Sequence, residues 1–293
     1  MMIRRKSIYS LIIFTFFSLS FLKAFSQEVV DTIKNRSIFE AYIEEMSSFS
    51  NESLSFLNVR TAKYFLGKPY VASTLEKNKK EKLVVNFEEF DCTTFVETCL
   101  ALSLTLKSEQ QTYENYCKNL TNIRYRKGII DGYTSRLHYV TEWIDNAESD
   151  SLLQNISITI GGKEYNKSLN FMSKHPQYYE KLKDDSSNLI KIKDIESAIN
   201  KRGMYAFVPI GAIYRAKRYI NDGDIIIFAT SIDGLDYSHI GIAYKQNESL
   251  HFIHASSRAK KVIIESKTIE EYCQSSKKCT GISVLRLKER LHK

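Results

Sequence analysis

The sequence has no long apolar run beyond residue 22, so nothing after that point is expected to span a membrane. The one such run, residues 8–22, is shorter than the roughly 20 residues that a spanning helix needs, and it follows three basic residues at positions 4–6. Ala24 and Ser26 are small residues at the two positions that a signal peptidase reads. These features predict an export signal over residues 1–26 that is cleaved after Ser26. The alternative is an uncleaved membrane anchor.

Cysteine is missing from the positions just after the predicted cleavage point, where a lipoprotein would carry its acylated cysteine. The mature chain is therefore expected to be exported and to lie in the periplasm or outside a bacterial cell, without a stable membrane span. Cleavage would remove four basic residues and no acidic ones, which lowers the formal net charge from +8 to +4.

Aromatic residues do not interleave with the lysines as a nucleic-acid surface would require. The lysines are scattered, apart from residues 77–82 and Lys277-Lys278, and we interpret them as a solvated face. We therefore predict no nucleic-acid partner. Weak attraction to an anionic polymer is an open alternative.

Internal repeats and low-complexity linkers are absent as well. The roughly 265 residues from Gln27 onward suit one elaborated domain, so we predict a single domain over residues 27–293 with insertions at about 108–203. Helical periodicity precedes a series of short β-branched runs, which favours an α+β fold with helices packed on a central antiparallel sheet. The expected helices cover residues 28–66 (one or two helices), 92–107, 112–120 and 172–182, with another around Trp143, and the expected strands cover 83–85, 156–160, 205–210, 224–229, 239–244, 250–254, 262–265 and 282–287.

All five cysteines lie in the predicted mature chain, and an odd number leaves at least one thiol unpaired. Cys92 is the candidate for that thiol. Cys273 and Cys279 flank a short polar segment and are placed to close a small disulfide loop. Cys99 and Cys117 are expected in the core.

The segment around Cys92 carries the clearest sign of chemistry. Cys92 follows Asp91 and begins an apolar run with helical spacing, which predicts that it is the first residue of a helix. The thiolate is the nucleophilic form of cysteine, and the partly positive end of a helix lowers the pKa of a thiol below its free value of about 8.5. We therefore predict that Cys92 is a nucleophile.

Two later histidines lie in strand-like runs, His239 close to Gly241 and His254 at the end of the next run. Neighbouring antiparallel strands bring facing side chains together, so one histidine can orient the other, which serves as a base toward Cys92. One alternative is that both are ordinary core histidines. The other is a zinc site, but the only closely spaced pair is His251 and His254, which point to opposite faces of a strand, so we predict no metal.

Five short segments follow one another in a characteristic order: residues 67–70 (GKPY), 91–96 (DCTTFV), 222–228 (DGDIIIF), 238–243 (SHIGIA) and 252–256 (FIHAS). In order and rough spacing they resemble the motifs of the NlpC-type, papain-like cell-wall cysteine hydrolases. The resemblance implies a papain-like fold with its nucleophile at a helix N-terminus. By position it implies that Cys92 is the nucleophile, His239 the base and His254 the residue that orients the base. It also implies that Tyr70 helps polarise the scissile carbonyl.

The chain departs from the usual motifs, because Cys92 is followed by two threonines rather than serine and glycine, and no tryptophan-glycine-glycine follows Tyr70. Residues 70–76 (YVASTLE), 135–139 (SRLHY) and 171–176 (FMSKHP) instead resemble a branch described as N-acetylmuramoyl-L-alanine amidase-like. That branch is taken to act on peptidoglycan fragments, splitting the muramic acid lactyl group from the first alanine of the stem peptide. We expect a monomer and no cofactor.

Three other functions remain open on these residues. An endopeptidase that cuts the stem peptide next to D-glutamate would use the same triad. An acyltransferase would share the cysteine, and a non-catalytic wall-binding module would not need it.

Polar residues in these segments are candidates for substrate binding. Arg136 is suited to a stem-peptide carboxylate through a forked pair of hydrogen bonds, and Glu76 and His138 are chargeable groups that the motif order places near Cys92. The alternatives are a surface position for Arg136 and a core position for Tyr139. The candidate set is Glu76, Thr93, Ser135, Arg136, His138, Tyr139 and Ser238.

Overall fold

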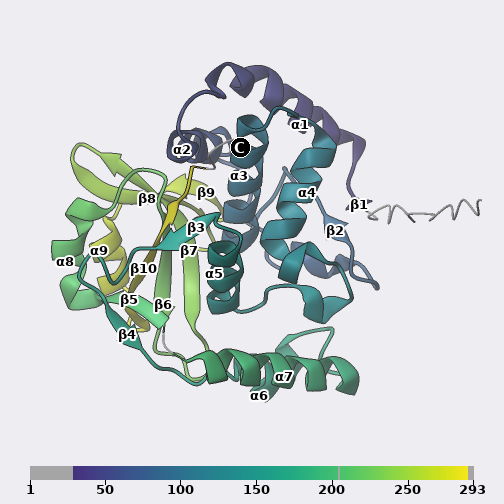
Figure 1. Cartoon of the computed structure of the whole chain (residues 1–293), viewed down its shortest axis with the longest axis vertical. Coiled ribbons are helices and arrows are strands. Elements are labelled where there is room, and N and C mark those ends of the chain that lie inside the picture. The colour runs from purple at the N-terminus through teal and green to yellow at the C-terminus, as the bar shows by residue number, and fades with distance from the viewer. Residues whose placement is uncertain (1–28, 204, 290–293) are drawn as a thin grey trace, which may run out of the picture.

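The computed structural model of the chain describes residues 29–203 and 205–289 (Figure 1). The predicted export signal over residues 1–26 lies outside them. The described helices are α1 (Ile33–Met46), α2 (Leu54–Tyr64), α3 (Cys92–Lys107), α4 (Tyr113–Arg124), α5 (Val140–Ser149), α6 (Phe171–Lys174), α7 (Ser186–Arg202), α8 (Ile213–Ala216) and α9 (Ile269–Gln274). The described strands are β1 (Val29–Val30), β2 (Leu83–Val84), β3 (Leu153–Asn155), β4 (Lys163–Tyr165), β5 (Tyr205–Pro209), β6 (Ile225–Thr230), β7 (Tyr237–Gln246), β8 (Ser249–Ser256), β9 (Lys261–Ile264) and β10 (Cys279–Leu287). In these two ranges no helix combines the length and the apolar character needed to cross a membrane.

An antiparallel sheet organises the fold. Its strands run in the order β4-β5-β10-β6-β7-β8-β9, and β3 also pairs with β10. Strands β1 and β2 form a separate parallel pair. In Figure 1, helices α1 to α5 lie on one side of the sheet, α8 and α9 lie on the other, and α6 and α7 run along the bottom of the view. The predicted α+β architecture, with helices packed on an antiparallel sheet, is confirmed.

The sheet is apolar on both faces where β6, β7 and β8 meet. Ile240 and Ile253 belong to the large core shared with α3, whereas Phe228 and Phe252 belong to a second core shared with Ile269 of α9. Alternate residues of a strand point to opposite faces, so this central part of the sheet is covered on both sides.

Helix α3 is the central helix of the larger core. Each of its residues from Thr94 to Leu106 is buried, as expected for a helix covered all round. The hydroxyls of Ser103 and Thr105 donate to carbonyls one turn earlier, each at 2.8 Å. Glu97 accepts from Arg124 of α4 at 2.7 Å. The buried polar groups of α3 therefore have partners, which makes burial of the whole helix tolerable.

Residues 108–203 contribute to both layers of the fold. Helix α4 packs on α3, β3 pairs with β10, and β4 pairs with β5. At the start of α5, the N–H of Thr141 donates to the buried carboxylate of Asp236 at 2.8 Å. Asp236 also accepts from the N–H of Tyr237 at 2.8 Å. One carboxylate thus joins the N-terminus of α5 to the first residue of β7.

The strand predicted over residues 156–160 is wrong. The strand there is β3, Leu153–Asn155, and residues 157–161 form turns. The side chain of Asn155 accepts from the N–H of Ser157 at 3.0 Å, and the N–H of Gly162 returns to the carbonyl of Ser157 at 2.8 Å. An Asx turn therefore ends the strand before the alternating residues begin.

The helix predicted over residues 172–182 is also wrong, because α6 is a single turn that ends at Lys174, ahead of Pro176. The long helix of this region is α7, which the periodicity did not predict. Its buried residues are only Ile192, Glu196 and Ile199, so its apolar stripe is too narrow to stand out.

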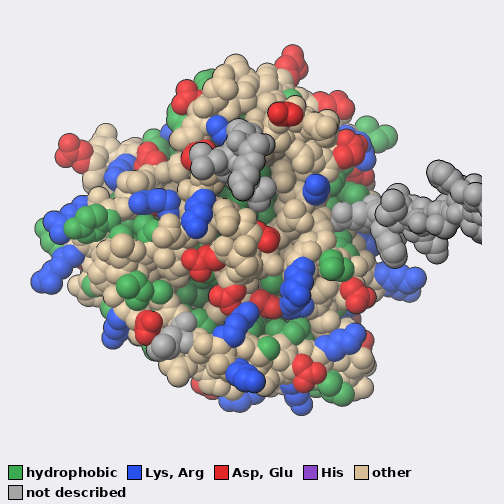
Figure 2. All heavy atoms as spheres, viewed as in Figure 1, with side chains coloured by type: hydrophobic (Ala, Val, Ile, Leu, Met, Phe, Trp, Pro, Cys, Tyr) green, Lys and Arg blue, Asp and Glu red, His purple; other side chains and the backbone are tan. Residues whose placement is uncertain are grey.

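Charged side chains of both signs are mixed on the face shown in Figure 2. Lysine and arginine lie among aspartate and glutamate, and no patch of one sign covers the described part of this face. A nucleic-acid surface needs clustered basic side chains, which this face does not present.

The predicted disulfide is confirmed. Cys273 in α9 bonds to Cys279, the first residue of β10, with the Cα atoms 5.3 Å apart. Cys92, Cys99 and Cys117 are free thiols, and the last two are buried as predicted.

Replacing Cys273 and Cys279 together by alanine is expected to lower the free energy of unfolding by about 2 kcal/mol, because the bond restricts the unfolded chain. Urea unfolding followed by circular dichroism measures this. The reduced wild-type protein is the matched control and should lose about the same stability. An unchanged midpoint in both samples would contradict the expectation.

Candidate active site

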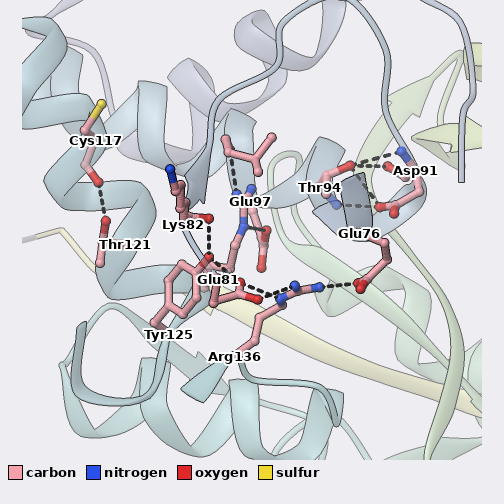
Figure 3. A network of polar contacts seen from close by, with 12 residues as sticks. Glu76, Glu81, Lys82, Asp91, Thr94, Glu97, Cys117, Thr121, Tyr125 and Arg136 are labelled. Atoms are coloured by element: carbon pink, nitrogen blue, oxygen red, sulfur yellow. Dashed lines mark hydrogen bonds and ion pairs between the residues drawn. The ribbon is translucent and has the colours of Figure 1, made fainter. Parts of the chain in front are cut away.

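Helix α3 begins at Cys92 because Asp91 caps it. The Asp91 carboxylate accepts from the N–H of Thr94 at 2.8 Å, and the Thr94 hydroxyl accepts from the N–H of Asp91 at 3.0 Å (Figure 3). This reciprocal pair is a capping box. Backbone N–H groups in the first turn of a helix have no partner within the helix, so the thiol of Cys92 lies at the end of α3 that presents backbone donors.

Tyr70 is held close to the same helix start. Its N–H donates to the carbonyl of Lys260 at 2.9 Å, and its segment also pairs with Phe90, two residues before Cys92. Burial raises the pKa of Tyr70, and the neighbouring Cys92 and Asp91 raise it further. The phenol therefore keeps its proton at neutral pH and remains a hydrogen-bond donor.

His239 and His254 are in direct contact across β7 and β8. The Nε2 atom of His239 lies 2.6 Å from Nδ1 of His254. Gly241 makes room for this contact, because a Cβ atom there would lie 3.2 Å from Cβ of His254 and 2.6 Å from the ring of Phe252. The missing side chain allows close approach of the two strands at this point.

Aromatic rings surround the histidine pair. The ring centroid of Tyr272 in α9 lies 5.8 Å from each imidazole. Phe228 lies 5.9 Å from His239, and Phe252 lies 4.5 Å from His254. These contacts restrict rotation of both imidazoles, and the Cys273–Cys279 bond ties α9, which carries Tyr272, to the sheet.

The sulfur of Cys92 reaches the backbone beside His239. The N–H of Ile240, the next residue in β7, forms a hydrogen bond with this sulfur. Since Nε2 of His239 contacts His254, Nδ1 is the ring nitrogen of His239 that does not take part in this contact.

The environment of the site favours uncharged groups. Burial raises the pKa of Cys92 to about 12, the Asp91 carboxylate adds to this rise, and hydrogen bonds from Thr93 and Ile240 offset part of it. Burial lowers the pKa of His239 to about 3, with a smaller contribution from His254, and lowers that of His254 to about 4. At neutral pH the resting site therefore holds a thiol and two neutral imidazoles.

The lowered pKa expected for Cys92 is thus wrong. The helix N-terminus does favour a thiolate, but the sulfur is withdrawn from water and lies next to the capping carboxylate. Burial is the larger effect.

Arg136 binds two carboxylates of the protein itself (Figure 3). Its Nε and Nη2 donate to Glu81 at 3.0 and 2.7 Å, and its Nη1 donates to Glu76 at 2.5 Å. Tyr125 also donates to Glu81, at 2.8 Å. The guanidinium is thereby engaged, and Glu76, whose side chain is 28% exposed, is the partner that a ligand can reach.

Three further predicted residues make contacts inside the fold. The hydroxyl of Ser135 donates to a neighbouring carbonyl at 2.7 Å. Nε2 of His138 lies 2.9 Å from the carbonyl of Tyr133, and burial lowers the pKa of His138 to about 3. Tyr139 is buried and donates to Glu196 at 2.8 Å.

The last two predicted residues, Thr93 and Ser238, lie beside Cys92 and His239. The Thr93 hydroxyl is 4.0 Å from the sulfur of Cys92. Ser238 is exposed and directly precedes His239.

A cavity of about 190 Å³ opens beside the histidines. Most of the residues that line it were not predicted from the sequence. Glu265 was missed: its Oε2 lies 3.4 Å from Nε2 of His254. Glu265 follows β9, which pairs with β8, so the alternation of this hairpin was the available signal. Within residues 29–203 and 205–289, no group of three His, Cys, Asp or Glu residues is arranged to hold a metal ion. The cavity wall includes His239, His254, Arg258, Glu265, Lys267 and Tyr272.

Comparison with known proteins assigns the chain to a family. A model of the N-acetylmuramoyl-L-alanine amidase-like family matches residues 60–282. The chain belongs to this family. This amidase-like chain is also similar to an N-acetylmuramoyl-L-alanine amidase from Bacteroides uniformis, with 37% identity and a TM-score of 0.75 over 80% of this chain and 99% of that one.

Two further solved structures resemble the amidase-like chain. One is a Bacteroides fragilis protein, provisionally named a xylanase, with 38% identity and a TM-score of 0.73 over 78% of this chain and 100% of that one. The other is a Legionella pneumophila protein with 20% identity and a TM-score of 0.64 over 87% of this chain and 94% of that one, which shows the fold alone. None of the curated proteins compared with the chain matches it.

In the resting amidase-like protein, Cys92 is expected to react with iodoacetamide more slowly at pH 8 than a free cysteine, whose pKa is about 8.5. Because burial raises the pKa of Cys92 to about 12, the rate should keep rising above pH 10. Mass spectrometry on a Cys99→Ala/Cys117→Ala background, where Cys92 is the remaining free thiol of the described residues, measures the rate. A plateau near pH 8 would contradict the raised pKa.

Gly241→Ala is expected to lower the free energy of unfolding by about 1–3 kcal/mol, because the added Cβ overlaps the Phe252 ring and the Ile253 carbonyl. Thermal unfolding measures the loss. The control is Gly211→Ala, where a Cβ meets nothing within 4 Å and stability should hardly change. Equal stability of both variants would show that β7 and β8 are not closely packed at Gly241.

Proposed function

We propose that this protein is a peptidoglycan amidase with a cysteine nucleophile. It hydrolyses the bond between the lactyl group of muramic acid and the first alanine of the stem peptide. Family membership supports the substrate class. The observation that supports the chemistry is the 2.6 Å contact between His239 and His254, which engages Nε2 of His239 and leaves Nδ1 outside that contact.

In the first step, Nδ1 of His239 takes the proton of Cys92 while the sulfur attacks the lactyl carbonyl carbon. Since thiol and imidazole are both neutral at rest, this transfer accompanies attack rather than preceding it. A carbon–sulfur bond forms, and the carbonyl electron pair moves to oxygen. The backbone N–H of Cys92 and the hydroxyl of Tyr70 are the donors for that oxyanion, and donors of this kind act strongly where water is excluded.

In the second step, the tetrahedral intermediate collapses and the carbon–nitrogen bond breaks. The imidazolium of His239 returns its proton to the alanine nitrogen, and the stem peptide leaves with a free amine. The lactyl group remains on Cys92 as a thioester. Water, deprotonated by His239, then hydrolyses it to a carboxylate and restores the thiol.

We assign substrate binding to the groups that a ligand can reach. Glu76 is partly exposed and is held by Arg136, while Thr93 and Ser238 lie beside Cys92 and His239. Ser135, His138 and Tyr139, together with Arg136, hold this part of the chain in place.

The fold and location complete the proposal. We assign the protein to the papain-like NlpC-type hydrolases, since the helix that starts at Cys92 and the strands that carry His239 and His254 follow in the expected order. Residues 27–293 then form one catalytic domain that acts outside the cytoplasm after removal of residues 1–26.

Purified protein incubated with a disaccharide-tetrapeptide muropeptide is expected to release free disaccharide and intact tetrapeptide, identified by mass spectrometry. Cys92→Ala should abolish this release, because the nucleophile is lost. The matched control is Cys117→Ala, which removes a different free thiol and should retain activity.

Other products would overturn the proposal in different ways. Cleavage after D-glutamate would keep the cysteine chemistry but make the protein an endopeptidase. Full amidase activity in Cys92→Ala would exclude the nucleophile. Release of reducing sugar from xylan, with no cut in the muropeptide, would favour a glycosidase.

A further inference from the structure

We infer that Glu265 is a positioning residue whose carboxylate sets the tautomer of His254 and, through it, that of His239. Its catalytic consequence rests on the proposed function. The inference about the two imidazoles rests on geometry alone and is tested separately below.

Glu265 continues a diagonal line of side chains across three strands. His254 lies next to Gly241 and contacts His239, which is two residues earlier in β7. The N–H of Glu265 donates to the carbonyl of Phe252 at 2.9 Å, so Glu265 lies opposite Phe252, two residues before His254 in β8. Diagonal neighbours on adjacent antiparallel strands are within reach of long side chains. The line therefore runs from His239 through His254 to Glu265.

The Glu265 carboxylate is itself held in place. Its Oε1 accepts from the N–H of Lys267 at 3.2 Å and from the hydroxyl of Ser266 at 3.3 Å. Its Oε2 lies 3.4 Å from Nε2 of His254, whose side chain is only 1% exposed. Nε2 of His254 makes no hydrogen bond within the described chain, and the Glu265 carboxylate is an acceptor within 3.4 Å of it.

The proposed chemistry requires one set of proton positions along this line, and it is the set that an acceptor beside Nε2 of His254 favours. Nδ1 of His239 can receive the Cys92 proton only if it carries none, so the neutral ring must carry its proton on Nε2. That N–H donates to Nδ1 of His254, which must then be bare, and the proton of His254 must lie on Nε2. The Glu265 carboxylate lies 3.4 Å from this atom and can only accept a hydrogen bond.

The opposite arrangement would disable the base. If His254 carried its proton on Nδ1, that atom would donate to Nε2 of His239, and the proton of His239 would move to Nδ1. Nδ1 could then no longer accept a proton from Cys92. A carboxylate beside Nε2 of His254 excludes this arrangement, because a bare Nε2 would face an acceptor. A neutral imidazole can carry its single proton on either nitrogen, so an acceptor fixed beside one nitrogen is needed to select the tautomer.

The test compares Glu265→Gln with the wild-type protein. Glutamine keeps the size of the side chain but offers both a donor and an acceptor, so both tautomers of His254 become possible. Nitrogen-15 NMR of histidine-labelled resting protein distinguishes protonated from bare ring nitrogens. We expect the wild type to have Nε2 protonated on both rings, and Glu265→Gln to show a mixture of tautomers.

The kinetic expectation is a loss in kcat with little change in KM, because Glu265 acts on the base rather than on substrate. The loss should lie between about 10-fold and 10⁴-fold, the range for residues that orient a catalytic group. Glu270→Gln is the matched control. It removes the same charge from nearby α9, where Glu270 accepts from Gln274, and should leave the histidine spectrum and kcat unchanged.

Each outcome decides one point. Wild-type tautomers and kcat in Glu265→Gln would overturn the inference. A loss of activity with wild-type tautomers and a lower melting temperature would also overturn it, since Glu265 would then serve stability alone. Mixed tautomers in Glu265→Gln, with no muropeptide cleavage by the wild type, would support the role of Glu265 while rejecting the proposed function.

Discussion

Desolvation of the Cys92 thiol and of the two histidines is the constraint on which the rest of the site depends. Burial is the main reason why the Cys92 thiol keeps its proton and why both histidines are neutral. The same burial strengthens every hydrogen bond made there, because the local dielectric is low. A neutral resting pair avoids the cost of holding a separated charge pair in the core.

The sheet supplies the geometry that this chemistry needs. Strands β7 and β8 carry His239 and His254, and Gly241 allows the second ring to approach the first. On the other side of the reactive groups, a capping box fixes where α3 begins, and pairing with Phe90 places Tyr70 beside it. Cys92, Tyr70 and the two histidines are therefore each held by a regular element or by backbone hydrogen bonds, which limits the freedom of their side chains.

Much of the fold was predictable because its signals are local. The six strands after residue 203 show β-branched runs between turn residues, and α3 shows an aspartate before a long apolar stretch. Helix α7 was not predictable, since three buried residues in 17 give no clear period. The turn after β3 depends on one side-chain hydrogen bond from Asn155, which apolar alternation does not reveal.

The candidate site was likewise predictable only in part. Motif order picked out Cys92 and the histidines, but it could not show how charges pair across the fold. Arg136 is paired with Glu81 and Glu76, which lie 55 and 60 residues before it. The pKa of Cys92 could not be read from its helical position either, because burial and a contact with Ile240, 148 residues later, also act on it.

The hydrogen bond between the N–H of Thr141 and Asp236 connects residues 108–203 to the strand that carries His239. A shortened chain without this segment would lose Thr141 as a partner and leave Asp236 buried with one fewer donor. Removing one partner of a buried charge is costly, and here the cost would fall three residues from His239. The segment therefore supports the start of strand β7, and grafting the motif strands alone onto a smaller scaffold would remove this support from the strand that carries His239.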